Sequence, residues 1–550
     1  MNADGHGLGP DSSIGVNRRS PMLRFVSSGL VSAAPVEQST TTPFPFALSF
    51  VLSTSSLAPV ALYIGIRDSP VVDNGIIHDT ITGNEWCHDM NLETAKQAVV
   101  ESQESAFPVI VPRELELPVD SGKVVSVSGV RRSGKTFLLL ALAKRLVESG
   151  VPRERIVYVN FDDPRLLPAS ALDFEVLREA CRELSLEPGR EPTYMLLDEV
   201  QQAEDWELGV RRLHDTREFR VFVTGSSSRM LSSDIATSLR GRGMNFELLP
   251  FSPAEFLAAR GVNVDARTAY SRRRFEVQRL MQEYFVYGGF PEVVLASEET
   301  LKQRILKEYV ETMFVRDLVE RNRVRNPGAM RELFRFLVTN VSSPFSANAF
   351  WKWLRNAHPL TKRTLLSYVS CLEESGLVFL VRKFSHSLKE QNLRPRKAYV
   401  VDSGLRTVYG LSFSQDKGRV LENAVFLQLR RQQTRSPLMG VYYWQNGRGR
   451  EVDFVVTEGR RVTRLIQVSL DPREFGVRER EVEPLVAAMQ DFRIKDGLVL
   501  TESYQAEERI GSRVVRFVPF WKWMLDGRAS HSGFKNADWR AGRAKSEARG

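Results

Sequence analysis

The chain has 550 residues, 42% of them hydrophobic and 26% charged, with a formal net charge of +9. This length is too great for one hydrophobic core and predicts roughly three globular domains. The three cysteines (Cys87, Cys181 and Cys371) are too far apart in sequence for a disulfide framework or a Cys-x-x-Cys zinc site. We therefore expect a cytoplasmic protein whose basic charge permits an anionic partner.

Residues 1–89 are rich in Gly, Ser, Thr and Pro and have no helical periodicity. Within them, residues 46–66 are largely apolar, uncharged and about long enough to cross a bilayer. Pro59 and the Ser/Thr cluster at 53–56 disfavour a membrane helix, and the run starts too far along the chain for a signal peptide. We interpret the segment as a disordered or non-native extension and expect no membrane association. A clean helical pattern begins at Met90.

Short apolar runs alternate with helical patterns from Val124 to Val223, which is typical of a parallel α/β sheet. Strands are expected at 124–128, 156–159, 194–197 and 221–223. A helix is expected to begin at Thr136, after the first strand, and to end at Gly150.

The first strand leads into a glycine-rich loop, Gly129-Val-Arg-Arg-Ser-Gly134-Lys135-Thr136. This spacing matches a P-loop, in which glycines let backbone N–H groups approach phosphate oxygens. Lys135 is expected to reach the β- and γ-phosphates, and the Thr136 hydroxyl to bind Mg²⁺. We predict that ATP is bound by Gly129, Val130, Arg131, Arg132, Ser133, Gly134, Lys135, Thr136 and Phe137.

Two acids, Asp198 and Glu199, come directly after the apolar run 194–197. In a P-loop protein the first acid of such a pair binds Mg²⁺, and the second orients or deprotonates the attacking water. Asp198 is therefore predicted to bind the metal. Glu199 and Lys135 are predicted to be catalytic, which indicates Mg²⁺-dependent ATP hydrolysis.

Hydroxyl side chains follow the run 221–223, so Thr224 or Ser226 is a candidate for a place near the γ-phosphate. A Ser-rich turn is the alternative. Arg240 and Arg242 flank a glycine, and one of them is expected to stabilise or sense charge on the γ-phosphate, of its own nucleotide or a neighbour's.

Several motifs together resemble a known family. They are residues 129–136, Leu-Leu-Asp-Glu-Val-Gln at 196–201 with Trp206, Thr-Gly-Ser-Ser-Ser at 224–228, Ser-Leu-Arg-Gly-Arg at 238–242, Leu-Pro-Phe-Ser-Pro-Ala-Glu-Phe at 249–256 and Tyr-Gly-Gly-Phe-Pro-Glu at 287–292. Over residues 100–525 the chain resembles uncharacterised archaeal and bacterial AAA+-type (STAND-like) P-loop ATPases with a C-terminal domain of unknown function.

The resemblance implies an α/β protein with four folded parts. These are an AAA+-like parallel-sheet core at 90–262, a helical lid at 263–327, a winged-helix segment at 328–410 and a PD-(D/E)XK nuclease-like α/β domain at 411–525. Residues 526–550 are polar and basic, so we expect a disordered tail there.

The winged-helix segment holds 13 Lys or Arg against 5 Asp or Glu, so the basic charge of the chain is local. Thr361 is expected to cap a helix of the recognition type. Candidates for phosphate contacts include Lys352, Lys362, Arg363, Lys383, Arg394, Arg396 and Lys397. We expect a nucleic-acid partner here, with a contact between domains or with a partner protein as the alternative.

In the nuclease-like domain the resemblance implies a metal site built from Glu422, Asp453 and Gln467. Gln467 replaces the usual acid, and Ser469 stands where the family pattern has a lysine. The site is therefore expected to be degenerate and cleavage lost. Our leading hypothesis is an ATP-driven switch on a DNA- or partner-binding C-terminal half, in one copy or a homo-oligomer. The alternatives are an ATP-regulated nuclease and a signalling NTPase that acts through protein contacts.

Overall fold

The computed structural model describes residues 90–184, 191–225, 239, 241–265, 267–410, 417–447, 449–474 and 476–529. The chain divides into two units, residues 1–81 and 82–550, and all described residues belong to the second. The predicted N-terminal extension lies outside the described residues. Within the described ranges, no helix has both the length and the apolar character that a membrane span requires.

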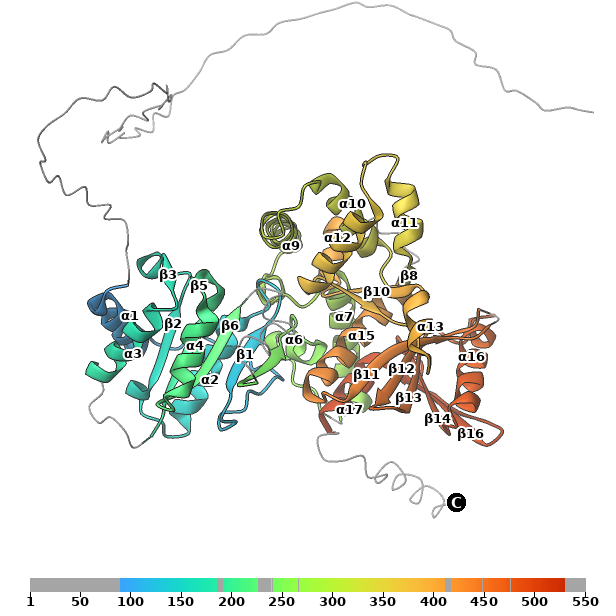
Figure 1. The fold of residues 1–550 in the computed structure, drawn as a ribbon. Coiled ribbons are helices and arrows are strands. Elements are labelled where there is room, and N and C mark those ends of the chain that lie inside the picture. The colour runs from blue at the N-terminus through green and yellow to red at the C-terminus, as the bar shows by residue number, and fades with distance from the viewer. Residues whose placement is uncertain are drawn as a thin grey trace, which may run out of the picture. The chain divides into compact units, whose positions relative to one another are not determined.

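A five-stranded parallel sheet forms the P-loop part, in the order β2-β4-β6-β1-β7 (Figure 1). Its strands are β1 (Val124–Ser128), β2 (Ile156–Asn160), β4 (Thr193–Asp198), β6 (Phe219–Gly225) and β7 (Gly243–Glu247). The parallel sheet and four of its strands are as predicted, whereas β7 was not. Because β6 lies between β4 and β1, the carboxyl ends of these three strands meet at one edge.

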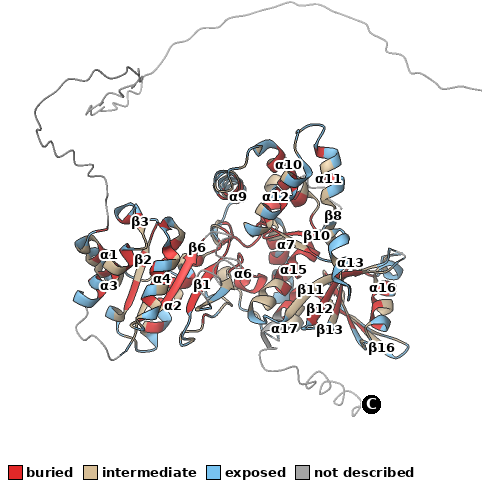
Figure 2. Ribbon diagram, in the orientation of Figure 1, coloured by how far each residue is buried: buried red, intermediate tan, exposed pale blue. Residues whose placement is uncertain are grey.

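Helices cover both faces of this sheet, which explains why its strands are apolar runs (Figure 2). Alternate side chains of one strand enter different clusters: Met195 and Leu197 pack on one face, and Leu196 on the other. The first face is covered by α1 (Leu92–Glu104), α3 (Asp173–Leu184) and α4 (Trp206–Asp215), and the second by α2 (Lys135–Glu148). The short strands β3 (Ala169–Ser170) and β5 (Ala203–Glu204) pair beside the main sheet.

Helix α6 (Pro253–Ala259) lies at the end of the predicted core. The stretch 263–327, predicted to be helical, contains α7 (Arg273–Tyr287), α8 (Pro291–Leu295), α9 (Glu299–Thr312) and the π-helix η6 (Met313–Glu320). A capping box fixes the start of α6, because Ser252 and Glu255 each accept the other's backbone N–H through their side chains.

The basic segment folds as helices around a three-stranded antiparallel sheet of order β8-β10-β9. The elements are α10 (Pro327–Thr339), β8 (Ser343–Phe345), α11 (Ala347–Leu354), α12 (Lys362–Glu374), β9 (Val378–Val381), α13 (Leu388–Leu393) and β10 (Arg396–Val400). As predicted, Thr361 caps α12 by accepting the Thr364 N–H. The central strand of this sheet is β10.

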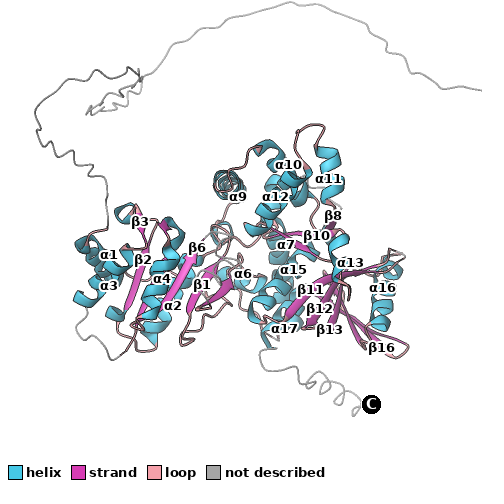
Figure 3. Cartoon of the chain, in the orientation of Figure 1, coloured by secondary structure: helices cyan, strands magenta, loops and turns pink. Residues whose placement is uncertain are grey.

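The C-terminal part is a six-stranded mixed sheet of order β11-β12-β13-β14-β16-β15 (Figure 3). Its elements are α14 (Gly404–Tyr409), α15 (Lys417–Arg435), β11 (Met439–Gln445), β12 (Glu451–Glu458), β13 (Arg461–Val468), α16 (Val477–Asp491), β14 (Asp496–Thr501), β15 (Ala506–Ile510), β16 (Arg513–Pro519) and α17 (Phe520–Ala529). The expectation that structure ends at residue 525 is wrong, because α17 continues to Ala529 and packs through Phe520 and Met524.

Candidate functional site

The P-loop follows β1 directly and opens α2. Gly134 has φ +96°, the left-handed region that favours glycine, and no side chain caps the N–H groups of the first turn of α2. A Cβ at Gly129 would lie 2.3 Å from the Leu248 carbonyl oxygen. The tight backbone and the open helix N-terminus together form a cradle suited to an anion.

Lys135 points back into this loop and is 5% exposed. Its Nζ lies 3.4 Å from Glu199 Oε1 and donates to the Val130 carbonyl at 3.4 Å. An ammonium has three N–H donors, and these two contacts are long. Lys135 is therefore held loosely enough to take a phosphate oxygen as a partner.

Asp198, at the end of β4, is buried and accepts hydrogen bonds from three hydroxyls. Thr136 Oγ1 donates to Asp198 Oδ2 at 2.6 Å and Tyr158 Oη donates to the same oxygen at 2.9 Å, while Thr224 donates to Oδ1. The Thr136 hydroxyl and the Asp198 carboxylate are adjacent oxygen donors of the kind that Mg²⁺ prefers. The residues present therefore fit the predicted metal.

Glu199 has a backbone φ of +52°, unusual for a residue with a side chain. Its N–H donates to Thr224 Oγ1 at 3.2 Å, so β6 fixes this conformation. Burial raises the pKa of Glu199, but the charge of Lys135, a hydrogen bond from Gln201 and the charge of Arg131 together outweigh burial and hold the pKa below its usual value. Glu199 is thus ionised near neutral pH and able to accept a hydrogen bond or a proton.

Comparisons with known proteins agree with this geometry. A model of the AAA domain matches residues 121–257. An uncharacterised protein of Methanocaldococcus jannaschii is 32% identical over 468 residues, which are 84% of this chain and 98% of that protein. The chain belongs to the same family of AAA-type ATPases.

Other similarities of the AAA-type ATPase are more distant. An uncharacterised protein of Haemophilus influenzae is 27% identical over 406 residues, covering 73% of this chain and 94% of that protein. Domains of unknown function (DUF8612 and DUF4143) match residues 278–416 and 417–523. The Walker-type ATPase PABY2304 of Pyrococcus abyssi aligns with 58% of this chain and 95% of its own, at 13% identity and a TM-score of 0.34. This last likeness is too partial to assign a role.

Two arginines of the P-loop contact the helical part of the ATPase. Arg131 Nε lies 2.9 Å from Asp317 Oδ1 in η6. Arg132 lies over the Tyr309 ring, and its Nη1 is 3.9 Å from Glu292 Oε2. Burial raises the pKa of Asp317, which is a cost that the Arg131 charge partly offsets. Both arginines were predicted as nucleotide ligands, and their contacts with α8, α9 and η6 were not foreseen.

Sequence reasoning also missed two residues that shape the site. Arg113 donates to the Ser133 carbonyl at 2.8 Å and to the Leu249 carbonyl at 2.6 Å, and it is paired with Glu255 at 3.0 Å. Tyr158 holds Asp198. Both residues lie far in sequence from the residues that they contact, and neither belongs to the P-loop motif or to the acid pair.

Arg242 lies at the opposite edge of the sheet. Its carbonyl accepts the N–H of Val124, the first residue of β1, and its side chain pairs with Asp215 at 2.7 Å. The P-loop leaves the other end of this strand, about 16 Å away for five residues. Arg242 therefore does not reach the phosphate site of its own chain. Ser226 and Arg240 lie outside the described residues, and Phe137 is half-exposed on α2.

The three residues predicted for the nuclease-like site do converge. Glu422 on α15, Asp453 on β12 and Gln467 on β13 line one cavity of about 600 Å³. The Asp453 N–H donates to Gln467 Oε1 at 3.1 Å, and Gln467 Nε2 donates to Glu481 on α16 at 2.5 Å. The cavity also receives Ser342, Lys397, Arg419, Gly449, Arg450, Glu451, Glu479, Arg480, Glu483 and Pro484.

Lys397 of β10 corrects two expectations. Its Nζ lies 2.9 Å from Glu422 Oε1, 2.8 Å from Asp453 Oδ1 and 2.5 Å from Glu451 Oε1. The cluster thus has a lysine after all, which comes from another part of the chain than position 469. Because Lys397 is 2% exposed, the expectation that it contributes to a surface phosphate contact is wrong. Burial lowers its pKa, but Asp453 and Glu422 raise it well above the usual value.

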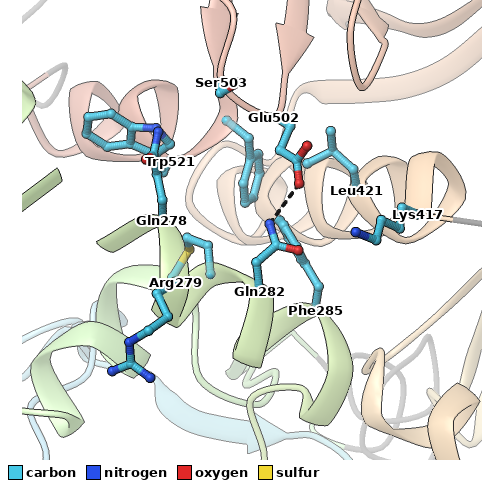
Figure 4. A pocket seen from close by; sticks show the side chains of 11 residues that line it. Gln278, Arg279, Gln282, Phe285, Lys417, Leu421, Glu502, Ser503 and Trp521 are labelled. Atoms are coloured by element: carbon cyan, nitrogen blue, oxygen red, sulfur yellow. Dashed lines mark hydrogen bonds between the residues drawn. The ribbon is translucent and has the colours of Figure 1, made fainter. Parts of the chain in front are cut away.

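A further cavity of about 350 Å³ lies between α7, α15 and α17 (Figure 4). Gln282 donates to Glu502 across it at 2.8 Å, and Phe285 and Trp521 form part of its apolar wall. None of the residues singled out in the sequence lines it.

Proposed function

We propose that the protein hydrolyses ATP with Mg²⁺ at the P-loop and uses this reaction as a switch that acts on its C-terminal half. The observation that carries the proposal is the meeting of Lys135, Thr136, Asp198 and Glu199 at the carboxyl edge of β1, β6 and β4. Backbone N–H groups of the P-loop and the N-terminus of α2 would bind the phosphates.

The contacts of the site suggest how its residues act. Lys135, whose Nζ lies 3.4 Å from Glu199 Oε1, would exchange this carboxylate for a phosphate oxygen. Glu199 then becomes free to orient a water molecule and to accept its proton. Thr136 and Asp198 would hold Mg²⁺, which supplies positive charge where negative charge develops on the phosphates. Thr224 keeps both acids in place through its bonds to Asp198 and to the Glu199 backbone.

The arginines of the P-loop suggest how hydrolysis is transmitted. Arg131 is paired with Asp317 of η6, and Arg132 contacts Glu292 and Tyr309. Phosphate oxygens are strong competitors for guanidinium groups. Binding of ATP would therefore weaken these contacts and change how the lid is held.

ATP turnover by full-length variants tests the catalytic proposal. Lys135→Ala is expected to abolish both ATP binding and hydrolysis, whereas Glu199→Gln is expected to retain binding and to lose about 100-fold or more in kcat. Lys144→Ala, at an exposed lysine on the same helix, is the matched control and should behave as the wild type. Normal hydrolysis by Lys135→Ala would show that the proposed site is not the one used.

For the C-terminal half we propose a nucleic-acid partner that binds at α11 and α12. Lys352 of α11 and Lys362 and Arg363 of α12 are exposed, and no ion pair within the described residues occupies them. Lys362 and Arg363 lie at the start of α12 and Lys352 lies in the last turn of α11, and exposed cations of this kind are suited to phosphate groups of a nucleic-acid backbone.

Salt dependence tests this partner. Affinity of the full chain for duplex DNA should fall steeply as salt rises. In Lys362→Glu/Arg363→Glu the log–log slope should become shallower by about 1 for each phosphate that the variant no longer neutralises. Arg272→Glu/Arg273→Glu, an adjacent exposed pair at the start of α7, is the charge-matched control. Equal decreases in affinity in both variants would indicate only a general charge effect and would contradict a site at α12.

One observation favours a second candidate, a partner protein. Trp353 on α11 is 60% exposed and Leu366 on α12 is 44% exposed. Large apolar side chains beside charges are typical of protein contacts. Salt-insensitive binding to DNA, together with a partner protein that Trp353→Ala no longer binds, would favour this candidate over DNA.

A further inference from the structure

The acid cluster of the C-terminal cavity raises the question of whether it can hold a metal ion. The oxygens that would bind the metal already accept hydrogen bonds. Glu422 Oε1 accepts from Lys397 at 2.9 Å and from Tyr399 Oη at 2.7 Å. Asp453 Oδ1 accepts from Lys397 at 2.8 Å, and Oδ2 accepts the Val468 N–H at 3.0 Å.

The third expected ligand is committed as well. Gln467 Oε1 accepts the Asp453 N–H, and its amide nitrogen donates to Glu481. Throughout the described ranges, no three His, Cys, Asp or Glu side chains are grouped so that they could hold a metal ion. The residues present therefore do not fit the divalent ion that a nuclease-like site implies.

Lys397 stands where that ion would stand. Its ammonium has three N–H donors, and three acidic side chains (Glu422, Glu451 and Asp453) surround it at 2.5–2.9 Å. Buried charges persist only when they are paired and hydrogen-bonded, and Lys397 meets that condition because it donates to Glu422 and Asp453 and is also paired with Glu451.

We infer that Lys397 is a built-in cation that replaces a divalent metal ion in the C-terminal cavity. The cavity is then a joint held together by an ammonium group and not a metal-dependent hydrolytic site. The inference does not depend on ATP hydrolysis at the P-loop, so each can fail without the other.

The position of Lys397 on β10 lets this contact connect two parts of the chain. Lys397 ties one end of this strand to α15 and β12. Just beyond the other end, Asp402 accepts the N–H of Gly289 at 2.6 Å and that of Gly404 at 2.8 Å. Gly289 precedes α8, whose Glu292 faces Arg132 of the P-loop. The built-in cation thus fixes the C-terminal sheet to the strand that also anchors the lid.

The charge balance of the cavity predicts what removal of the lysine does. Six acids line the cavity against four basic residues, one of which is Lys397. Without its ammonium, three adjacent acids lose their shared partner, and a divalent cation becomes their best replacement. Lys397→Met, which keeps the length and removes the charge, should therefore create a metal site.

Mn²⁺ binding to nucleotide-free full-length protein tests the inference, with Asp198→Asn as the common background to remove binding at the P-loop. The protein with Lys397 intact should show no Mn²⁺ site, as measured by electron paramagnetic resonance of free Mn²⁺. Lys397→Met should bind one Mn²⁺ per chain at least 10-fold more tightly, and Asp453→Asn in addition should remove it. Lys302→Met is the matched control, because that buried lysine has one carboxylate partner, Glu283, and its replacement should create no site.

Two results would overturn the inference. One is a Mn²⁺ site in the protein with Lys397 intact that Asp453→Asn removes. The other is a folded Lys397→Met, judged by circular dichroism, that gains no Mn²⁺ binding. If Lys397→Met does not fold, the protein with Lys397 intact still decides: its Asp453-dependent binding of Mn²⁺ contradicts a built-in cation, and its lack of such binding supports one.

Discussion

The phosphate site and the C-terminal cluster each contain a buried lysine, and the two lysines differ in how they are held. Lys135 has one carboxylate and one carbonyl at 3.4 Å, whereas Lys397 has three acidic side chains at 2.5–2.9 Å. A lysine whose donors are poorly used keeps the capacity to bind a ligand. A lysine that is surrounded by acidic partners contributes to the fold, and burial alone does not tell the two kinds of lysine apart.

The acids beside these two lysines, Glu199 and Glu422, differ in the direction of their pKa shifts. The pKa of Glu199 lies below its usual value, because Lys135, Gln201 and Arg131 together outweigh the effect of burial. Burial and then the charge of Asp453 raise the pKa of Glu422 to about 8, in spite of Lys397. Near neutral pH Glu199 is ionised and ready to accept a proton, whereas the Glu422 carboxyl is already held by hydrogen bonds from Lys397 and Tyr399. A catalytic base is expected only at the first site.

The largest effect on stability should come from replacing Lys397. Lys397→Met should lower the free energy of unfolding by about 3–5 kcal/mol in metal-free buffer, because it leaves buried acids without their partner. Lys302→Met should cost less, since one carboxylate is left. Thermal unfolding followed by calorimetry measures both. A smaller decrease in the free energy of unfolding for Lys397→Met than for Lys302→Met would contradict the structural role of Lys397.

At the P-loop site, substitution of an acid should change the rate of ATP hydrolysis more than the stability of the fold. Asp198→Asn should lower kcat for ATP by about 100-fold, because a neutral amide holds a cation poorly, with a melting temperature close to that of the wild type. Asp163→Asn, at a partly exposed acid after β2, is the control and should retain full turnover. Unchanged turnover in Asp198→Asn would remove this acid from the proposed reaction.

The strand that joins the two regions should show a pH dependence. Burial raises the pKa of Asp402 from 3.8 to about 7. Between these values the unfolded chain releases this proton and the folded chain keeps it, so the free energy of unfolding falls by up to about 1.4 kcal/mol for each pH unit as pH rises. Chemical unfolding between about pH 4.5 and about pH 7, which lies within that window, should show a shallower fall in Asp402→Asn. An identical slope in the variant would exclude Asp402 as its source.

The smallest effect is expected at the contact between the P-loop and the lid. A double-mutant cycle with Arg131→Ala and Asp317→Ala should give a coupling of about 1 kcal/mol in the free energy of unfolding without nucleotide. Saturating ATP should reduce this coupling, since phosphate competes for Arg131. A coupling that ATP leaves unchanged would argue that Arg131 does not respond to the nucleotide.

The sequence predicted the P-loop site well because its parts follow local rules. Gly134, Lys135 and Thr136 are adjacent, and Asp198 and Glu199 end an apolar strand whose partner strands are also recognisable. The position of Thr224 beside both acids followed from the same edge of the sheet. Strand β7 was missed because its residues Gly243–Glu247 are half-exposed and lack an apolar run.

What the sequence did not predict depends on partners far apart in the chain. Lys397 is separated from Glu422 by 25 residues and from Asp453 by 56, and it comes from a different sheet. The sequence around Gln467 has Ser469 at the position where a lysine was expected. Arg242 shows the same limit: β7 brings it to the other end of β1, and the sequence had left open whether it or Arg240 acts, and on which chain's nucleotide.

The π-helix η6 sets a strict requirement on the length of the chain. Successive residues of a helix are rotated by about 100° around its axis. A π-helix has more residues per turn than an α-helix, so its side chains point in directions that depend on the exact number of residues. Deleting one residue before Asp317 would rotate its carboxylate about a quarter-turn around the helix axis, away from Arg131. Contact with the phosphate loop is thus encoded in the spacing between Met313 and Asp317 as much as in the identity of the acid.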